Sequence, residues 1–194
     1  FDVEAKDFRK VYDLALDSKT NRRHYRRQAY DPKGAMLELL DWEPEFVRAA
    51  FIDLFDEGRE LEGRLHRFVF YCQTLFSQYR LARPKSRLPD HYHDDDYQMA
   101  TLYLTAQYPE RYAPYSSSLL LEVLGKLGAQ ELPVAADVLR YNKLLFTLHR
   151  FLKADPTTLA PYTTLLRPQD YAGASLLPVW HFMQFVRGKP ANSR

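Results

Sequence analysis

The chain has few cysteines and glycines and no long apolar run. Its 194 residues include a single cysteine, Cys72, so the chain cannot form an internal disulfide, and this composition fits a reducing cytoplasm. Only seven glycines occur, which argues against a turn-rich sandwich or barrel. No apolar run approaches a membrane span, and the opening residues FDVEAKDFRK alternate charged with apolar side chains, unlike a signal peptide. The sequence predicts a cytoplasmic protein with no membrane partner.

The chain also lacks a strong excess of either charge and the motifs of common catalytic sites. A formal net charge of +2 is too small to indicate wholesale binding to nucleic acid or lipid, so any such site must come from local clusters. The phosphate-binding pattern G-x-x-x-x-G-K-[ST] is absent, as are G-x-S-x-G, H-E-x-x-H and paired cysteines. We therefore predict that this region is not an enzyme and needs no cofactor or metal.

Apolar residues recur at helical spacing along most of the chain. With 46% hydrophobic residues there is enough apolar material for one substantial core. Helices are expected from near Phe8, from Pro44 and from Leu61, the last two forming an antiparallel hairpin. The run SLLPVWHFMQFV is interrupted by Pro178 and is open between a helix, which is favoured, and a buried extended segment. We predict an all-α protein, a multi-helix orthogonal or antiparallel bundle of about seven to nine helices.

The expected organisation has three parts. Residues 1–30 would form an N-terminal helix and a basic linker, residues 31–188 a helical domain, and residues 189–194 a polar tail or linker. The loop RPKSRLPD is a further candidate boundary within the helical domain. The chain begins without methionine and ends in GKPANSR, which suggests a piece of a longer protein.

Two interpretations are open for HYHDDD, which holds His91, His93, Asp94, Asp95 and Asp96. Imidazoles and carboxylates are metal ligands, and a metal there would make this the centre of an enzyme. Carboxylates in a first helical turn also stabilise its exposed N–H groups and the positive end of the helix dipole. Because adjacent aspartates on a helix point in different directions, capping of a helix from about Asp94 to Tyr108 is the favoured interpretation.

Arginines alternate with aromatic residues in NRRHYRRQAY, and RLARPKSR is a second basic stretch. Guanidinium groups neutralise phosphates and aromatic rings stack on bases, the two contributions that a non-specific nucleic-acid surface needs. The alternative is a solvated linker. The predicted nucleic-acid contacts are Arg22, Arg23, Tyr25, Arg26, Arg27, Tyr30, Arg83, Lys85 and Arg87.

Tyrosines gather around the bend PERYAPY, where two prolines disfavour a continuous helix. A tyrosine has a large apolar body and one polar group, which suits a recognition surface as well as the edge of a core. The core is the favoured environment. If the segment is instead a partner-binding surface, its residues are Tyr108, Arg111, Tyr112 and Tyr115.

Two stretches together resemble a known family. WEPEFVRAAFIDLFDE with LEGRLHRF, and ATLYLTAQYPERYAPY, are similar to the helical region ahead of the AAA+ motor in Mcr-type (methylcytosine-dependent) restriction GTPase subunits and their relatives in prokaryotic defence islands. The resemblance runs from Trp42 to about Val186. It includes the Tyr-Pro-acid-basic-Tyr turn at Tyr108 to Tyr112 and the aromatic run Trp180 to Phe185.

The resemblance implies a modular role. In such proteins this part recognises a target, commonly DNA, while the motor hydrolyses nucleotide and a partner subunit cuts. This chain lacks the motor and its phosphate loop, so GTP hydrolysis is not carried over to its residues. We predict a non-catalytic DNA or nucleic-acid recognition or adaptor module of a restriction-like defence AAA+ protein (McrB-like), with DNA and a nuclease or motor subunit as partners. The alternative is a protein-interaction module that docks a partner subunit or senses a phage protein.

Overall fold

The computed structural model describes residues 1–17, 30–94, 96–155, 157, 164, 171 and 173–188. This part of the chain contains eight α-helices and no β-strand, which confirms the predicted all-α, multi-helix bundle. None of these eight helices is both long enough and apolar enough to cross a membrane. The chain divides into two compact units, unit 1 (residues 1–107) and unit 2 (residues 108–194).

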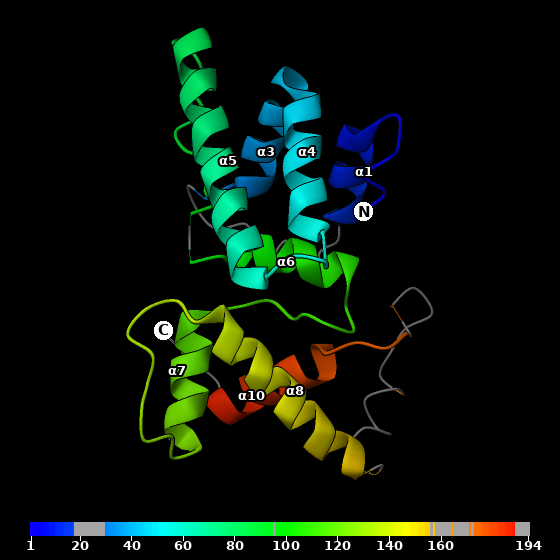
Figure 1. Cartoon of the computed structure of the whole chain (residues 1–194), viewed down its shortest axis with the longest axis vertical. Helices are drawn as coiled ribbons and strands as arrows, with labels where there is room; N and C mark the ends of the chain where they lie inside the picture. The colour runs from blue at the N-terminus through cyan, green and yellow to red at the C-terminus, as the bar shows by residue number, and fades with distance from the viewer. Residues whose placement is uncertain are drawn as a thin grey trace, which may run out of the picture. The chain divides into compact units, whose positions relative to one another are not determined.

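Unit 1 is built around a helical hairpin. Its helices are α1 (Phe8–Ala15), α3 (Pro32–Trp42), α4 (Pro44–Phe55), α5 (Leu61–Ala82) and α6 (Gln98–Gln107). Figure 1 shows α3, α4 and α5 side by side, α1 beside α4, and α6 across one end of the α4–α5 pair. The antiparallel hairpin of α4 and α5 is therefore as predicted. α5 has 22 residues, and its C-terminal end extends beyond α4 (Figure 1).

Acidic residues and prolines determine where α3 and α4 begin. Asp31 is the N-cap of α3, where its carboxylate accepts the backbone N–H of Gly34 at 3.0 Å. Pro32 and Pro44 lie in the first turns of α3 and α4, where a backbone donor has no intrahelical partner to lose. Glu43, with φ −135° and ψ 69°, separates the two helices. The chain thus turns sharply from α3 into α4 within one residue.

Aromatic rings from four helices form the centre of unit 1. Phe51 of α4 contacts Phe68 of α5 and Tyr103 of α6, with ring centroids 5.2 Å and 5.0 Å apart. Tyr12 of α1 contacts Phe51 at 5.8 Å. All four side chains are fully buried, and such rings contribute large apolar areas to a core. Helix α1 therefore packs with the helices that follow it, across the expected division between residues 1–30 and 31–188.

Helix α6 begins at Gln98 and not near Asp94. Asp96 and Tyr97 have φ values of 56° and 61°, in the left-handed region, so a right-handed helix does not extend back through them. The first turn of α6 consequently contains no acidic residue. Asp94 and Asp96 precede the helix, so the expectation that they lie in its first turn is wrong, and Asp95 is outside the described residues.

Unit 2 contains α7 (Ser117–Lys126), α8 (Val138–Ala154) and α10 (Leu177–Arg187), with α10 packed on both of the others (Figure 1). The stretch SSSLLLEVLGKLGAQ predicts a serine-capped helix, and Ser116 caps α7, because its hydroxyl accepts the backbone N–H of Leu119 at 3.3 Å. Pro178 lies in the first turn of α10, which is why the run that contains it is helical in spite of the proline. Each of the three helices contributes a fully buried side chain to the core of unit 2: Leu120, Leu145 and Met183.

The boundary between the units falls after Gln107. The loop RPKSRLPD, a candidate boundary in the sequence, lies inside unit 1. The tail at residues 189–194 lies outside the described residues. The pair Asp155-Pro156 predicts the N-cap and first-turn proline of a short helix to about Arg167, and most of that segment also lies outside the described residues.

Candidate nucleic-acid interface

Only part of the predicted nucleic-acid surface falls within the described residues. The structure does not describe the first basic stretch, which holds Arg22, Arg23, Tyr25, Arg26 and Arg27. Tyr30, the next predicted contact, is half-buried and packs edge to face on Tyr92 with ring centroids 5.2 Å apart. A base that stacked on Tyr30 would compete with this intramolecular contact.

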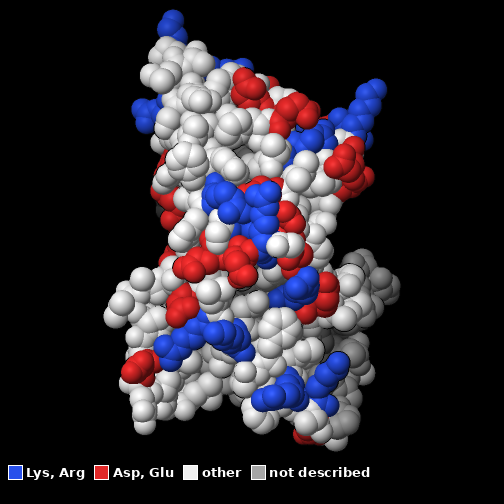
Figure 2. Space-filling model, in the orientation of Figure 1, with Lys and Arg blue, Asp and Glu red and all other residues white. Residues whose placement is uncertain are grey.

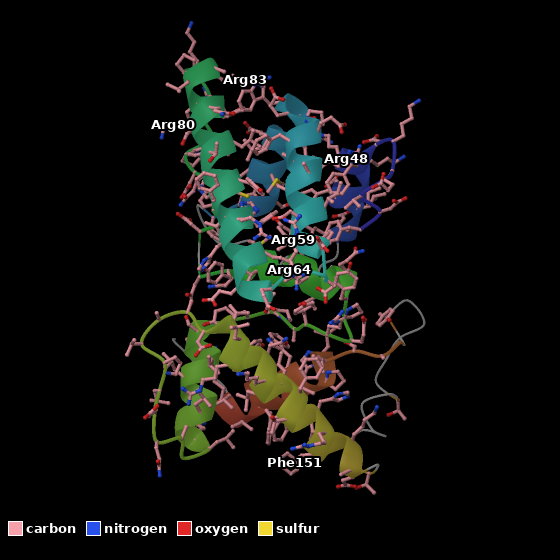
Figure 3. The ribbon with its side chains drawn as sticks, in the orientation of Figure 1. Arg48, Arg59, Arg64, Arg80, Arg83 and Phe151 are labelled. Carbon is pink, nitrogen blue, oxygen red and sulfur yellow. The ribbon has the colours of Figure 1, made fainter. Side chains whose placement is uncertain are left out.

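The second basic stretch is described, and it forms a cluster at the C-terminal end of α5. Its four exposed members, hereafter the α5 basic cluster, are Arg80, Arg83, Lys85 and Arg87. Figure 3 shows Arg80 and Arg83 at the end of the helix that extends beyond α4. The structure thus brings together three of the predicted contacts and adds Arg80 to them.

Aromatic rings lie under two of these cations. The guanidinium of Arg80 is 5.9 Å from the ring centroid of Phe76, and that of Arg83 is 5.5 Å from the ring centroid of Tyr79. Each pair has the i, i+4 spacing that places side chains next to each other on a helix. A cation over a ring is attracted by the ring's quadrupole, which restricts its movement without neutralising its charge.

Tyr79 also holds the loop that carries Lys85 and Arg87. Its hydroxyl donates to a carboxylate oxygen of Glu38 on α3 at 2.5 Å, so it accepts from the Ser86 hydroxyl at 3.0 Å. The Ser86 oxygen in turn accepts the backbone N–H of Leu88 at 3.1 Å. This chain of hydrogen bonds fixes the loop to α3 and α5, so that the basic residues project from a defined surface.

Among the described residues, no carboxylate balances the charge of the α5 basic cluster. In the part of the chain that the structure describes, each of the other five arginines of unit 1 has a carboxylate oxygen within 3.3 Å: the pairs are Arg9–Asp41, Arg48–Glu45, Arg59–Asp53, Arg64–Glu57 and Arg67–Asp53. Figure 2 shows such basic and acidic side chains intermingled over the body of the unit. No described carboxylate forms an ion pair with the α5 basic cluster. Its charges are thus available to a polyanion.

The two histidines of the metal hypothesis are buried and engaged in hydrogen bonds. His93 donates from Nδ1 to the carbonyl oxygen of His91, and its Nε2 lies 2.8 Å from the hydroxyl of Tyr103. The backbone N–H of His93 donates to Nδ1 of His91 at 3.0 Å. Burial lowers the pKa of His93 to about 3 and also lowers the pKa of His91, so both rings are neutral at pH 7.

These contacts give the histidines a structural role. Three of their four ring nitrogens already have partners within the loop and α6. Among the described residues, no group of three or more His, Cys, Asp or Glu side chains is placed to hold a metal ion. Cys72 is buried, and an apolar cavity beside it between α3, α4 and α5 has a volume of only about 10 Å³.

The tyrosine-rich bend is mostly core. Tyr112 and Tyr115 are buried, in the core environment that was favoured, so the alternative that they form a partner-binding surface with Tyr108 and Arg111 is corrected for these two residues. The Tyr115 hydroxyl accepts the backbone N–H of Asp137 at 3.0 Å, and its ring contacts that of Tyr141 at 5.1 Å. These contacts attach the start of α8 to the bend. Tyr115 thus lies in the core, the environment that the sequence favoured. Tyr108 is half-buried, and only Arg111 of the predicted set is exposed.

A second basic and aromatic surface, in unit 2, was not predicted. The spacing of apolar residues in VAADVLRYNKLLFTLHRFLKAD predicts an amphipathic helix with Leu139 among its apolar residues. In the structure Leu139 is 41% exposed, and it shares the outer face of α8 with Lys143, Phe146 and Arg150, hereafter the α8 outer stripe. The signal that could have found this stripe is the absence of any Asp or Glu from residues 138–154.

Comparisons of the chain with protein-family models, with curated proteins and with solved structures give no match.

Proposed function

We propose that the chain is a non-catalytic module that recognises nucleic acid, and that the α5 basic cluster contacts its phosphates. The observation that carries the proposal is the charge balance of unit 1. Each of the other five described arginines of unit 1 has a carboxylate partner, and no described carboxylate pairs with the arginines of this cluster. Unpaired cations on an exposed helix end attract a polyanion and release its counterions. Because such contacts involve phosphates, they select no base sequence.

The proposal includes a cellular setting. The residues that resemble the helical region of Mcr-type restriction subunits favour an adaptor or recognition part of a prokaryotic restriction-like defence protein, with a motor or nuclease subunit as partner. This setting places the module in the cytoplasm. The support for it is the residue pattern of Trp42 to Val186 together with the all-helical fold.

The test compares two double charge reversals in the full chain. Arg83→Glu with Arg87→Glu alters the α5 basic cluster. Lys6→Glu with Lys10→Glu makes the same change in net charge at exposed residues in and just before α1. Binding of fluorescein-labelled 20-nucleotide single strands and 20-base-pair duplexes is followed by fluorescence anisotropy at several salt concentrations, with thermal unfolding as a check on folding.

We expect the Arg83 and Arg87 variant to lose at least about tenfold in affinity for unrelated sequences alike. The slope of its log affinity against log salt concentration should also be smaller, by the amount that about two phosphate contacts contribute. The Lys6 and Lys10 variant should bind nearly as the wild type does. Equal losses in both variants would show that only net charge matters. No binding by the wild type at low salt would leave the protein-docking alternative, which capture of a partner from nuclease-treated lysate would then support.

A further inference from the structure

We infer that the α8 outer stripe is a second binding site, in unit 2, that takes single-stranded nucleic acid. The proposed function requires only phosphate contacts at the end of α5, in the other unit. The α8 outer stripe would add base stacking, and with it a preference for unpaired strands. Its residues lie on a different helix from those of the α5 basic cluster.

The spacing of the four residues places them on one face of the helix. Leu139, Lys143, Phe146 and Arg150 follow one another at intervals of four, three and four residues, which keeps them within a narrow arc of an α-helix. The opposite side of α8, with Val138, Tyr141 and Leu145, is buried in unit 2. Lys143 and Arg150 are seven residues apart, or about 10 Å along the helix axis. Cationic and apolar side chains therefore alternate along an exposed line.

The aromatic members of this face are accessible. Phe146 is 45% exposed and lies between Lys143 and Arg150 along the stripe. Phe151, at the edge of the face, is 64% exposed, and the guanidinium of Arg150 lies 5.7 Å from its ring centroid. Figure 3 shows Phe151 near the C-terminal end of α8. Splayed bases stack on aromatic rings and on guanidinium planes, and this face offers both beside cations that can contact phosphates.

The charge of α8 is complementary to a polyanion. The helix has four Lys or Arg residues, Arg140, Lys143, Arg150 and Lys153, and no Asp or Glu. Within the described ranges, none of Lys143, Arg150 and Lys153 forms an ion pair. On α10, by contrast, Arg187 pairs with Glu122 of α7 at 3.2 Å. The positive charge on the outer face of α8 thus remains without an intramolecular counterion among these residues.

The arrangement favours a single strand over an anionic membrane. A helix that lies on a lipid surface separates its buried apolar face from its charged face. On α8 the wholly apolar face is already buried in the protein, and the exposed face mixes cations with rings. Interleaved rings and cations are the pattern by which proteins follow a single strand without reading its sequence.

The experiment uses the full chain and two matched pairs of variants. Phe146→Ala removes an exposed ring from the stripe, and Phe185→Ala removes an 81% exposed ring from α10 in the same unit. Lys143→Glu with Arg150→Glu reverses two charges of the stripe, and Lys6→Glu with Lys10→Glu is its control. The probes are a fluorescein-labelled thymidine 20-mer, a 20-base-pair duplex, vesicles of phosphatidylcholine with phosphatidylserine, and poly-glutamate.

We expect Phe146→Ala to weaken binding of the thymidine 20-mer by about fivefold to 100-fold, the range for loss of a stacked base, and to affect the duplex less. Lys143→Glu with Arg150→Glu should cost tenfold or more, while both control variants bind nearly as the wild type does. Unchanged binding of the 20-mer by Phe146→Ala overturns the inference, and so does tighter α8-dependent binding of vesicles or poly-glutamate than of the 20-mer. If only the Arg83 and Arg87 variant loses affinity, the proposed function stands without this site; if only the α8 variants do, the α5 basic cluster is the part that fails.

Discussion

The hydroxyl of Tyr103 donates to Nε2 of His93 at 2.8 Å in the core of unit 1. The direction of this hydrogen bond follows from the other side of the imidazole, because Nδ1 faces a carbonyl oxygen and must carry the proton. The Tyr103 oxygen then accepts from the hydroxyl of Tyr12 at 2.9 Å. A chain of neutral hydrogen bonds therefore joins α1, α6 and the loop before α6.

Stability should fall in mild acid because His93 is neutral when folded. Its pKa is about 3 in the native state and 6.5 when exposed, so between these values the unfolded chain binds a proton that the native chain does not. Stability attributable to this group is present above pH 6.5 and is lost as the pH falls. We expect the free energy of unfolding to drop by about 2 kcal/mol between pH 7 and pH 5 from His93 alone. Denaturant titrations at fixed pH measure it.

The matched variant for this measurement is His93→Gln, which retains an acceptor for Tyr103 but does not titrate. Burial also lowers the pKa of His91, His149 and His181, so the wild type and the variant share a background slope. The variant should be less stable at pH 7 and should depend less on pH between 7 and 5. Parallel curves for the two proteins would contradict the assignment.

Tyr79→Phe should loosen the loop that carries part of the α5 basic cluster. The substitution removes the hydroxyl that joins Glu38 and Ser86, at a cost of about 1–3 kcal/mol for the unpaired groups. Amide exchange at Leu88 should accelerate, as measured by hydrogen–deuterium exchange. Tyr71→Phe on the same helix is the control, because no hydrogen bond of the Tyr71 hydroxyl is found among the described residues. Similar exchange at Leu88 in both variants would count against this account of the loop.

Arg64→Ala should be strongly destabilising. Arg64 is buried where α4 turns into α5, and its Nη1 donates to the carbonyl of Leu54 at 2.9 Å and to Glu57 at 2.5 Å. Removing one partner of a buried ion pair leaves the other charge poorly solvated, at a cost of about 3 kcal/mol. Arg59→Ala removes a guanidinium that is 57% exposed, and its partner Asp53 keeps the pair with Arg67, so the substitution should cost less than about 1 kcal/mol. Thermal unfolding of the two variants compares them, and equal losses would refute the distinction.

Cys72 should not react in the native protein. Its side chain is buried on α5, and burial raises the pKa of its thiol far above the usual range, so little thiolate is present at pH 8. We expect no reaction with 5,5′-dithiobis(2-nitrobenzoate) under native conditions and one thiol per chain after unfolding in guanidinium. Rapid reaction of the native protein would mean that α5 opens readily.

Residues near a helix start predicted where some helices begin, and packing between residues distant in the chain decided where another begins. Pro44 marks the start of α4 as expected, and Ser116 caps α7, because a proline or a serine acts on the backbone within one turn. The start of α6 was missed, since the left-handed backbone at Asp96 and Tyr97 belongs to the loop that buries the two histidines. The residues of a single helical turn do not show that the preceding loop has this left-handed backbone.

The sequence by itself determined that this chain is helical, because apolar side chains at three- and four-residue spacing can be buried together only on a helix. It also located basic residues in the α5 to α6 loop. Only the tertiary structure decided which charges stay unpaired and which rings stay exposed, since both depend on partners distant in the chain. Asp53 neutralises Arg67, whereas Arg83 is exposed. Tyr115 is buried against Tyr141, whereas Phe146 is exposed. Pairing and burial are properties of the packed helices, and no local pattern of residues contains them.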